Sequence, residues 1–319
     1  MQNKVIEETN VAGFQSESLM MQVAKRLGMR KARWSLRRLH CPVSKSALVL
    51  EVGAGGNPYP RANILLDAME STIERNEQNL IIDRPLVLGL CEELPFKDKS
   101  FDFVIASHVL EHTDNPEKFL SELMRVGKAG YIETPEGWFE KMCAFTYHRL
   151  EVSSQNNSLL IRKKTSWKPE EIAKLWDIKL AHSKVLLDFL RVHPDLYHLR
   201  FYWKDSINFE VLNPFEDASW PYPEDAINKK NRNSNSTIKL KLRDFYLTII
   251  RRMFSQNIRN QGLTLTNLIR CPTCYSESLE ITKTSVTCEI CLARYEVKNG
   301  VPNLFPLNIS GFNQDRLQK

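Results

Sequence analysis

Short apolar runs alternate with amphipathic stretches over the first two-thirds of the chain. One stretch, NPEKFLSELMRV (115–126), carries its apolar positions at helical spacing and has Pro116 near its start. Four apolar runs have the length of buried strands: SALVLEV (46–52), NILLD (63–67), FDFVIAS (101–107) and GYIETP (130–135). Strands that alternate with helices predict an α/β fold with a doubly wound, Rossmann-like and mostly parallel sheet, for which we expect seven strands.

Later elements are predicted by the same patterns. The runs at 148–152 and 158–164 flank the turn-forming residues SSQNN and predict an inserted hairpin. A helix is expected to begin at Pro169. Two β-rich runs, 196–204 and 206–212, are separated by one residue, so we expect a tight hairpin that completes the sheet.

Basic residues concentrate in two segments outside the α/β region. The first, SLMMQVAKRLGMRKARWSLRRL, and the second, TIKLKLRDFYLTIIRRMF, both place apolar residues at helical spacing among Lys and Arg. A stretch with three prolines separates the second from the sheet region and predicts a linker, most flexible at 228–236. The expected organisation is a basic helical segment (1–40), the α/β domain (41–212), the linker (213–236), a basic amphipathic helix (237–260) and a cysteine module (265–308).

The composition is that of a globular protein. Of 319 residues, 42% are hydrophobic and 26% charged, which excludes collagen-like, coiled-coil and wholly disordered chains. No run approaches the roughly 18 apolar residues of a spanning helix, and the polar start lacks the apolar core of a secretory signal. We therefore expect a cytoplasmic protein, in which seven cysteines do not form a disulfide framework.

The formal net charge of +6 comes largely from the two basic segments. Three interpretations are open: nucleic-acid binding, contact with the anionic inner face of a membrane, and the solvated faces of packed helices. Solvated faces are favoured. The absence of a recognised RNA-binding motif disfavours nucleic acid, whereas aromatic and aliphatic residues among the cations of the second segment favour a peripheral membrane contact.

A glycine loop follows the first strand at Gly53 and Gly55. It does not fit a dinucleotide-binding turn, because Pro58 disfavours a helix there and Asp67 ends the next strand only twelve residues after Gly55. The loop instead suits a nucleoside without phosphates, whose ribose hydroxyls would donate to Asp67. The alternative is a structural glycine turn beside an incidental aspartate.

The segment GLCEELPFKDKSFDFVIASHVLEHTDNPEKFLSELMRV resembles class I S-adenosylmethionine-dependent methyltransferases of the small-molecule type, and the similarity covers 46–135. The resemblance implies a methyltransferase domain at 41–212 with S-adenosylmethionine as cofactor. Two departures from the family are Leu90, where an aspartate is frequent, and a first crossover too short for the usual helix. The implied cofactor-binding residues are Glu51, Gly53, Gly55, Asp67, Cys91, Glu92, Ser107 and His108.

Methyl transfer is an in-line displacement, to which an enzyme contributes proximity and alignment. A hydroxyl acceptor also needs a base, and histidine is matched to that task near neutral pH. His108 is the first candidate, with a cofactor-loop contact as its alternative role, and His148 is the second. Glu133 is a further candidate, whereas for His112 helix packing is the favoured interpretation.

Cys271, Cys274, Cys288 and Cys291 form two CxxC pairs with thirteen residues between them. This spacing predicts a tetrahedral zinc site with four thiolate ligands and a structural role, because no coordination position stays open. A redox pair is the alternative, but it would need only one CxxC. The surrounding sequence resembles the small zinc-ribbon activators of RNA and protein methyltransferases, here fused to the catalytic chain.

These features predict an S-adenosylmethionine-dependent methyltransferase that methylates a hydroxyl of a glycan, a lipid-linked sugar or another small natural product. One alternative is an RNA or protein methyltransferase with a built-in zinc-ribbon activator. The other is a catalytically silent binding module, which Leu90 favours and the intact Gly53, Gly55 and Asp67 disfavour.

Overall fold

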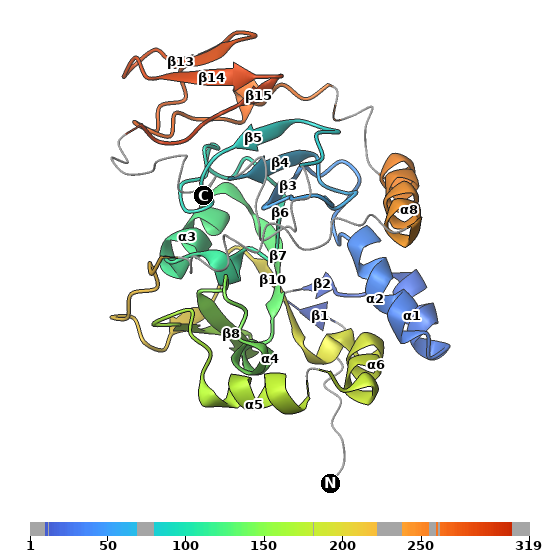
Figure 1. The fold of residues 1–319 in the computed structure, drawn as a ribbon. Coiled ribbons are helices and arrows are strands. Elements are labelled where there is room, and N and C mark those ends of the chain that lie inside the picture. The colour runs from blue at the N-terminus through green and yellow to red at the C-terminus, as the bar shows by residue number, and fades with distance from the viewer. Residues whose placement is uncertain are drawn as a thin grey trace.

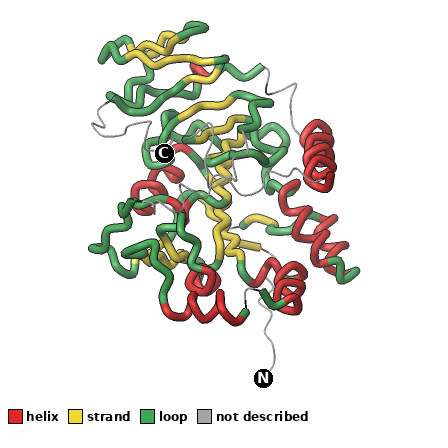
Figure 2. Tube along the Cα trace, in the orientation of Figure 1, coloured by secondary structure: helices red, strands yellow, loops and turns green. Residues whose placement is uncertain are grey.

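A central sheet of six strands organises the protein (Figures 1 and 2). The computed structural model describes residues 10–11, 13–68, 80–180, 182–221, 238–254, 260 and 262–307. The spatial order of the strands is β10-β7-β6-β3-β4-β5, and all pair in parallel except β10, which is antiparallel to β7. Their bounds are β3 Val49–Val52, β4 Ile64–Asp67, β5 Leu86–Leu88, β6 Phe103–Ser107, β7 Ala129–Pro135 and β10 His198–Lys204.

We expected seven strands in the central sheet, but six strands form it among the described residues, because the run at 206–212 leaves this sheet. That run forms β11 (Phe209–Val211), which pairs in parallel with β9 (Ser158–Lys163) in a separate sheet of order β11-β9-β8, where β8 is Leu150–Gln155. The turn at Asp205 has a positive φ of 62° and directs the chain toward β9, whose open edge takes the new strand. The predicted hairpin of β8 and β9 is confirmed.

The first basic segment forms two helices rather than one. Helix α1 (Leu19–Arg26) stops before Gly28, where a φ of +67° breaks the helix, and α2 (Arg30–Leu36) continues into the 3-10 turn η1 (Arg37–Leu39). The predicted helix at 115–126 is α3 (Pro116–Val126), which the Asn115 side chain caps. None of the helices in the described part of the chain is long and apolar enough to cross a membrane.

Further helices and strands complete the described chain. Helix α5 begins close to the predicted Pro169, and α8 lies within the predicted second basic helix. The expected flexible stretch 228–236 lies outside the described residues. The remaining bounds are β1 Asn10–Val11, β2 Phe14–Gln15, η3 Leu110–His112, α4 Gly137–Cys143, α5 Glu171–Lys179, α6 Lys184–Val192, η4 Pro194–Leu196, α8 Ile238–Phe254 and η6 Leu265–Asn267.

The two faces of the central sheet are covered differently. One face packs its buried residues, such as Leu50 and Val104, against Phe119 and Leu123 of α3. The other face has no helix between β3 and β4, as the short crossover predicts. Tyr59 of that crossover is 1% exposed and packs against this second face instead. A short loop anchored by one aromatic residue therefore replaces the usual crossover helix.

The cysteine module lies against the β5 edge of the sheet (Figure 1). It contains an antiparallel sheet of order β12-β13-β14-β15, with β12 Leu279–Ile281, β13 Ser285–Cys288, β14 Arg294–Lys298 and β15 Val301–Pro302. Leu304 N–H donates to Leu88 O at 2.7 Å, and Arg270 N–H donates to Pro95 O at 3.0 Å. The module and the α/β domain therefore share main-chain hydrogen bonds and a common hydrophobic core.

Candidate active site

The glycine loop leaves β3 at its carboxyl end, where ligands bind in open parallel sheets. Gly53 and Gly55 have φ angles of +69° and +58°, a conformation that side chains disfavour. The Gly55 N–H donates to Asp67 Oδ2 at 2.9 Å, and the Gly53 N–H donates to Leu66 O at 2.8 Å. These bonds hold the loop against the end of β4 and bring Gly53, Gly55 and Asp67 together.

Glu51 lies beneath this loop and is 3% exposed. The Tyr59 N–H donates to Glu51 Oε2 at 2.7 Å, which fixes the start of the crossover. Burial raises the pKa of the Glu51 carboxyl to about 7, against the opposing charges of Arg38 and Arg84. In the described structure Glu51 organises the loop, and its cofactor contact stays a prediction.

The predicted adenine-side residues lie where β5 ends. Gly89 N–H donates to Asp67 O at 3.0 Å, so this segment adjoins the glycine loop. The Cys91 thiol donates to Glu92 Oε2 at 3.1 Å, and the Thr113 hydroxyl donates to Glu92 Oε1. The end of β4, with a buried carboxylate, thus lies beside a second polar segment. The roles of these residues toward a ribose and a purine stay predictions.

His108 follows β6 and lies between two buried glutamates. Its Nδ1 is 3.0 Å from Glu111 Oε1 and its Nε2 is 3.3 Å from Glu133 Oε1, while Glu111 is 1% and Glu133 0% exposed. A φ of +58° at His108 sets this orientation. Burial lowers the pKa of the imidazole, but the hydrogen bonds and charges of the two glutamates outweigh it and raise the pKa to about 10.

This environment holds a proton on His108 at neutral pH. Both ring nitrogens face carboxylates, so neither is free to remove a proton from an acceptor. Glu133 also receives two hydrogen bonds from Arg37, at 2.8 and 2.7 Å, which together with His108 hold its pKa well below the usual range despite burial. The geometry therefore favours a positioning role for His108 over the predicted role of general base.

His148 belongs to a neighbouring cluster. Its Nδ1–H donates to Glu140 Oε2 at 2.6 Å, and its ring meets that of His112 edge-on at a centroid distance of 4.7 Å. Glu140 is 1% exposed and also pairs with Lys164 at 2.9 Å. His112 thus packs against His148, and Glu111 links this cluster to His108.

Three residues of the site were not singled out by the sequence patterns. Arg37 is one of seven cations in the first basic segment, and its spacing does not distinguish it from the others. Glu111 precedes a histidine in LEH, and Glu140 lies in GWFEKMC, where no motif marks it. Arg37 reaches Glu133 across 96 residues of sequence, whereas Glu111 and Glu140 contact histidines only three and eight residues away and lack a motif that marks them.

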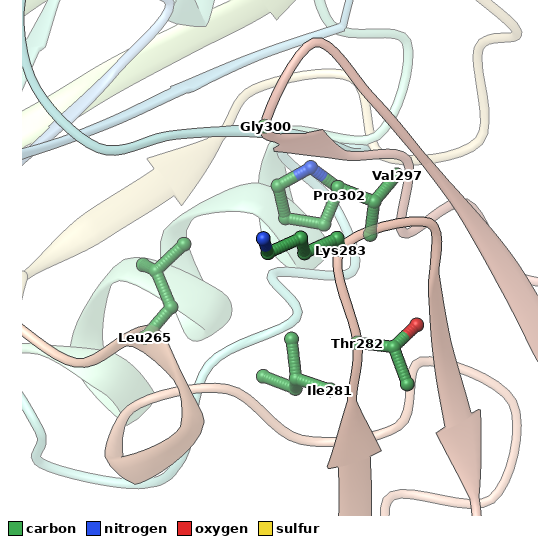
Figure 3. Close-up of a pocket in the computed structure, with 7 residues that line it drawn as sticks. All are labelled: Leu265, Ile281, Thr282, Lys283, Val297, Gly300 and Pro302. Carbon is green, nitrogen blue, oxygen red and sulfur yellow. The ribbon is translucent and has the colours of Figure 1, made fainter.

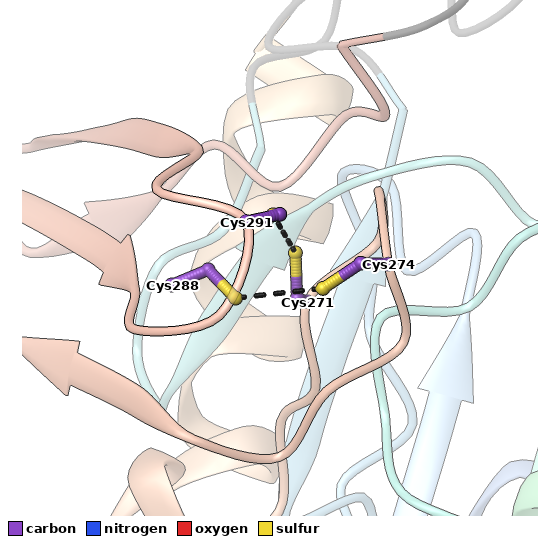
Figure 4. A group of neighbouring side chains, drawn as sticks. All are labelled: Cys271, Cys274, Cys288 and Cys291. Atoms are coloured by element: carbon purple, nitrogen blue, oxygen red, sulfur yellow. Dashed lines mark hydrogen bonds between the residues drawn. The ribbon is translucent and has the colours of Figure 1, made fainter.

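The four cysteines of the two CxxC pairs meet in the cysteine module (Figure 4). Sγ of Cys271 is 3.7 Å from Sγ of Cys291, and Sγ of Cys274 is 3.5 Å from Sγ of Cys288. Four sulfurs at about 2.3 Å from one zinc ion would be about 3.8 Å apart in a tetrahedron. The sulfur arrangement therefore fits a single tetrahedral ion.

The two CxxC turns have the same local geometry. The residue after each pair has a positive φ, 62° at Tyr275 and 60° at Leu292, and its N–H donates to the carbonyl oxygen of the first cysteine of its pair. The Tyr295 hydroxyl lies 3.3 Å from Cys271 Sγ, where it can donate to a thiolate. A hydrogen bond to a ligand sulfur is typical of metal sites.

A cavity of about 380 Å³ opens elsewhere on the cysteine module (Figure 3). Its walls are mainly aliphatic, with one lysine. The lining residues are Leu265, Ile281, Thr282, Lys283, Val297, Gly300 and Pro302. Its lining includes neither the glycine loop nor the histidine clusters, so it is not the cofactor site.

Comparison with known proteins finds a family match in the first half of the chain. Residues 50–132 match the family described as "Methyltransferase domain". This match covers less than half of the chain and supports methyltransferase activity. It lies within the resemblance stated for 46–135, and the order of the doubly wound sheet agrees with it.

Individual proteins are also similar to parts of the chain. An uncharacterized protein of Methanocaldococcus jannaschii is 44% identical over 84 residues, which are 25% of this chain and 40% of that protein. One solved chain, from a complex that contains the Haloferax volcanii Trm112 methyltransferase activator, is 15% identical and has a TM-score of 0.35; the match covers 58% of this chain and 93% of that chain. A Thermotoga maritima S-adenosylmethionine-dependent methyltransferase is 21% identical with a TM-score of 0.26, covering 38% of this chain and 56% of that one.

Proposed function

We propose that the protein transfers a methyl group from S-adenosylmethionine to a hydroxyl of a glycan, a lipid-linked sugar or another small natural product. The observation that carries this proposal is the junction of the glycine loop with Asp67 at the carboxyl end of a methyltransferase-type sheet. When bound, the cofactor would supply an electrophilic methyl group, and the acceptor hydroxyl would release its proton to solvent water, because both ring nitrogens of His108 are paired.

The residues of the chain would bind and orient the two reactants. Asp67 would accept from ribose hydroxyls, Gly53 and Gly55 would admit the methionine portion, and Cys91 and Glu92 would border the adenine. Ser107 ends β6 beside His108, at the edge where an acceptor would approach. The positive charge of His108, held by two glutamates, would orient acceptor oxygen atoms there.

Helix α1 supports an acceptor that is presented at a membrane surface. Leu19, Met20 and Leu27 are 75%, 64% and 68% exposed, although large apolar side chains are usually buried. They lie among exposed cations such as Arg26 and Arg30. Exposed apolar residues among cations are typical of helices that lie on anionic membranes, so a lipid-linked acceptor is the favoured member of the class.

We propose that the cysteine module binds one zinc ion through Cys271, Cys274, Cys288 and Cys291. Four thiolate ligands fill the coordination shell, so the ion would stabilise the module rather than activate a reactant. The module would support catalysis through its hydrogen bonds to the β5 edge. The same contact favours the second candidate, an RNA or protein methyltransferase that carries its own activator.

The test combines cofactor binding with acceptor fractionation. Calorimetry with S-adenosylmethionine should show binding, and NAD should show none. The purified protein is then incubated with radiolabelled S-adenosylmethionine and separate cell fractions of glycans, lipids, RNA and protein. Label in the glycan or lipid fraction supports the proposal, whereas label confined to RNA or protein supports the second candidate. Binding without label in any fraction would favour a silent module.

A further inference from the structure

Glu111, His112 and His148 form a compact cluster next to the end of β6. Their candidate ligand atoms all lie within 4.8 Å of one another. Glu111 is 1% exposed, and its Oε1 accepts from His108. Its Oε2 is also buried but has no hydrogen-bond partner among the described residues. A buried carboxylate oxygen without a partner is costly, so this atom points to a ligand.

The surroundings of His148 independently point to a metal ion. Its Nδ1–H donates to the buried Glu140 at 2.6 Å, so the lone pair of Nε2 can coordinate a metal ion. A carboxylate that fixes the far nitrogen of a histidine is the usual outer partner of a metal ligand. Lys164 holds the other oxygen of Glu140 at 2.9 Å, so the orienting carboxylate is itself fixed.

We propose that Glu111, His112 and His148 bind one divalent first-row transition-metal ion, separate from the four-cysteine site. Two imidazoles and one carboxylate suit such an ion and leave coordination positions open. Ligands at about 2.1 Å from one ion lie within about 4.2 Å of one another, so closing the cluster by less than about 1 Å would suffice. This placement rests on the proposed function in one respect: the open positions would take acceptor hydroxyl oxygens.

Cobalt binding tests the site without any requirement for activity. The full chain, with its cysteine module loaded with zinc, is dialysed against Co²⁺, and bound metals are measured by elemental analysis and visible absorption. Wild-type protein should bind one Co²⁺ with weak bands and no intense thiolate charge transfer. Glu111→Gln, His112→Gln and His148→Gln should each weaken binding more than tenfold, and Glu140→Gln about 10- to 100-fold.

Two matched variants serve as controls. Glu171→Gln and His182→Gln change exposed residues outside the cluster and should leave cobalt binding unchanged. The site would be overturned by wild-type protein that binds no cobalt or shows thiolate bands alone. Cobalt affinity in His112→Gln and His148→Gln equal to that of wild-type protein would also overturn it. Cofactor calorimetry on the same samples reports folding and separates the outcomes, because cobalt binding without cofactor binding contradicts the proposed function only.

Discussion

Gly53→Ala tests why a glycine follows β3. A Cβ at this position would lie 2.3 Å from Cγ2 of Val109, and the backbone has a φ of +69°. The left-handed conformation costs a non-glycine residue about 1 to 2 kcal/mol. Overpacking against Val109 costs about 1 to 3 kcal/mol more. The substitution should therefore lower the free energy of unfolding by about 2 to 5 kcal/mol.

Gly28→Ala is the matched control. Gly28 has nearly the same φ, +67°, but a Cβ there would meet nothing within 4 Å. Its cost should be limited to the backbone contribution of about 1 to 2 kcal/mol. Urea denaturation of both variants gives the difference, which measures the contact with Val109.

A double-mutant cycle identifies the contact directly. Val109→Ala removes the overlapping methyl groups, so Gly53→Ala with Val109→Ala should be less destabilised than the sum of the two single changes. Calorimetry with S-adenosylmethionine should show weaker binding in Gly53→Ala, since the loop must shift. Equal stability losses at Gly53 and Gly28, with no coupling to Val109, would refute the packing argument and leave ligand approach as the reason for the glycine.

Three further predictions concern the cofactor, the metal and pH. Asp67→Ala should weaken S-adenosylmethionine binding by about 1.5 to 3 kcal/mol in calorimetry, and unchanged affinity would exclude Asp67 from the ribose role. Cys288→Ser should reduce the zinc content of the purified chain from one ion per molecule and weaken cofactor binding. Atomic absorption that finds well below one zinc ion per wild-type chain, with all four thiols freely titratable, would contradict the site. Because the folded Glu51 carboxyl keeps its proton up to about pH 7, its stabilising contribution is full below about pH 4.5 and lost as pH rises through 7. In urea denaturation across this range, the free energy of unfolding of wild-type protein should fall as pH rises, and Glu51→Gln should lack this fall.

The sequence patterns predicted the elements whose signals are local. Helix α3 was predicted from the proline near its start and its apolar stripe, and both are found; the Asn115 cap is seen only in the structure. The missing crossover helix was predicted from Pro58 and the short distance to Asp67. Strand β5 was not predicted, because three buried residues give no periodic signal. The second strand of the expected last hairpin pairs with β9 rather than the sheet, a choice between two edges that local sequence does not determine.

The candidate site was predicted in part for a similar reason. Motif residues such as Gly55 and Asp67 lie within a short stretch of chain, and the structure brings them into direct contact. The role of His108, in contrast, depends on Glu133, 25 residues away, and on Arg37, 71 residues away in the opposite direction. A histidine near a cofactor loop predicts a base on chemical grounds, but the two carboxylates that change its protonation are visible only in the fold.

The cysteine module is placed to influence the cofactor region without touching a reactant. Its hydrogen bonds reach Leu88 and Pro95, on either side of the segment that carries Cys91 and Glu92. A segment fixed at both ends has fewer conformations to lose when it orders against a ligand, which improves binding. We expect a module of about 40 residues, with a small core of its own, to depend on a metal ion for folding. If the four cysteines bind zinc as proposed, the ion would act on this segment by holding those two hydrogen bonds in place, without an open coordination position.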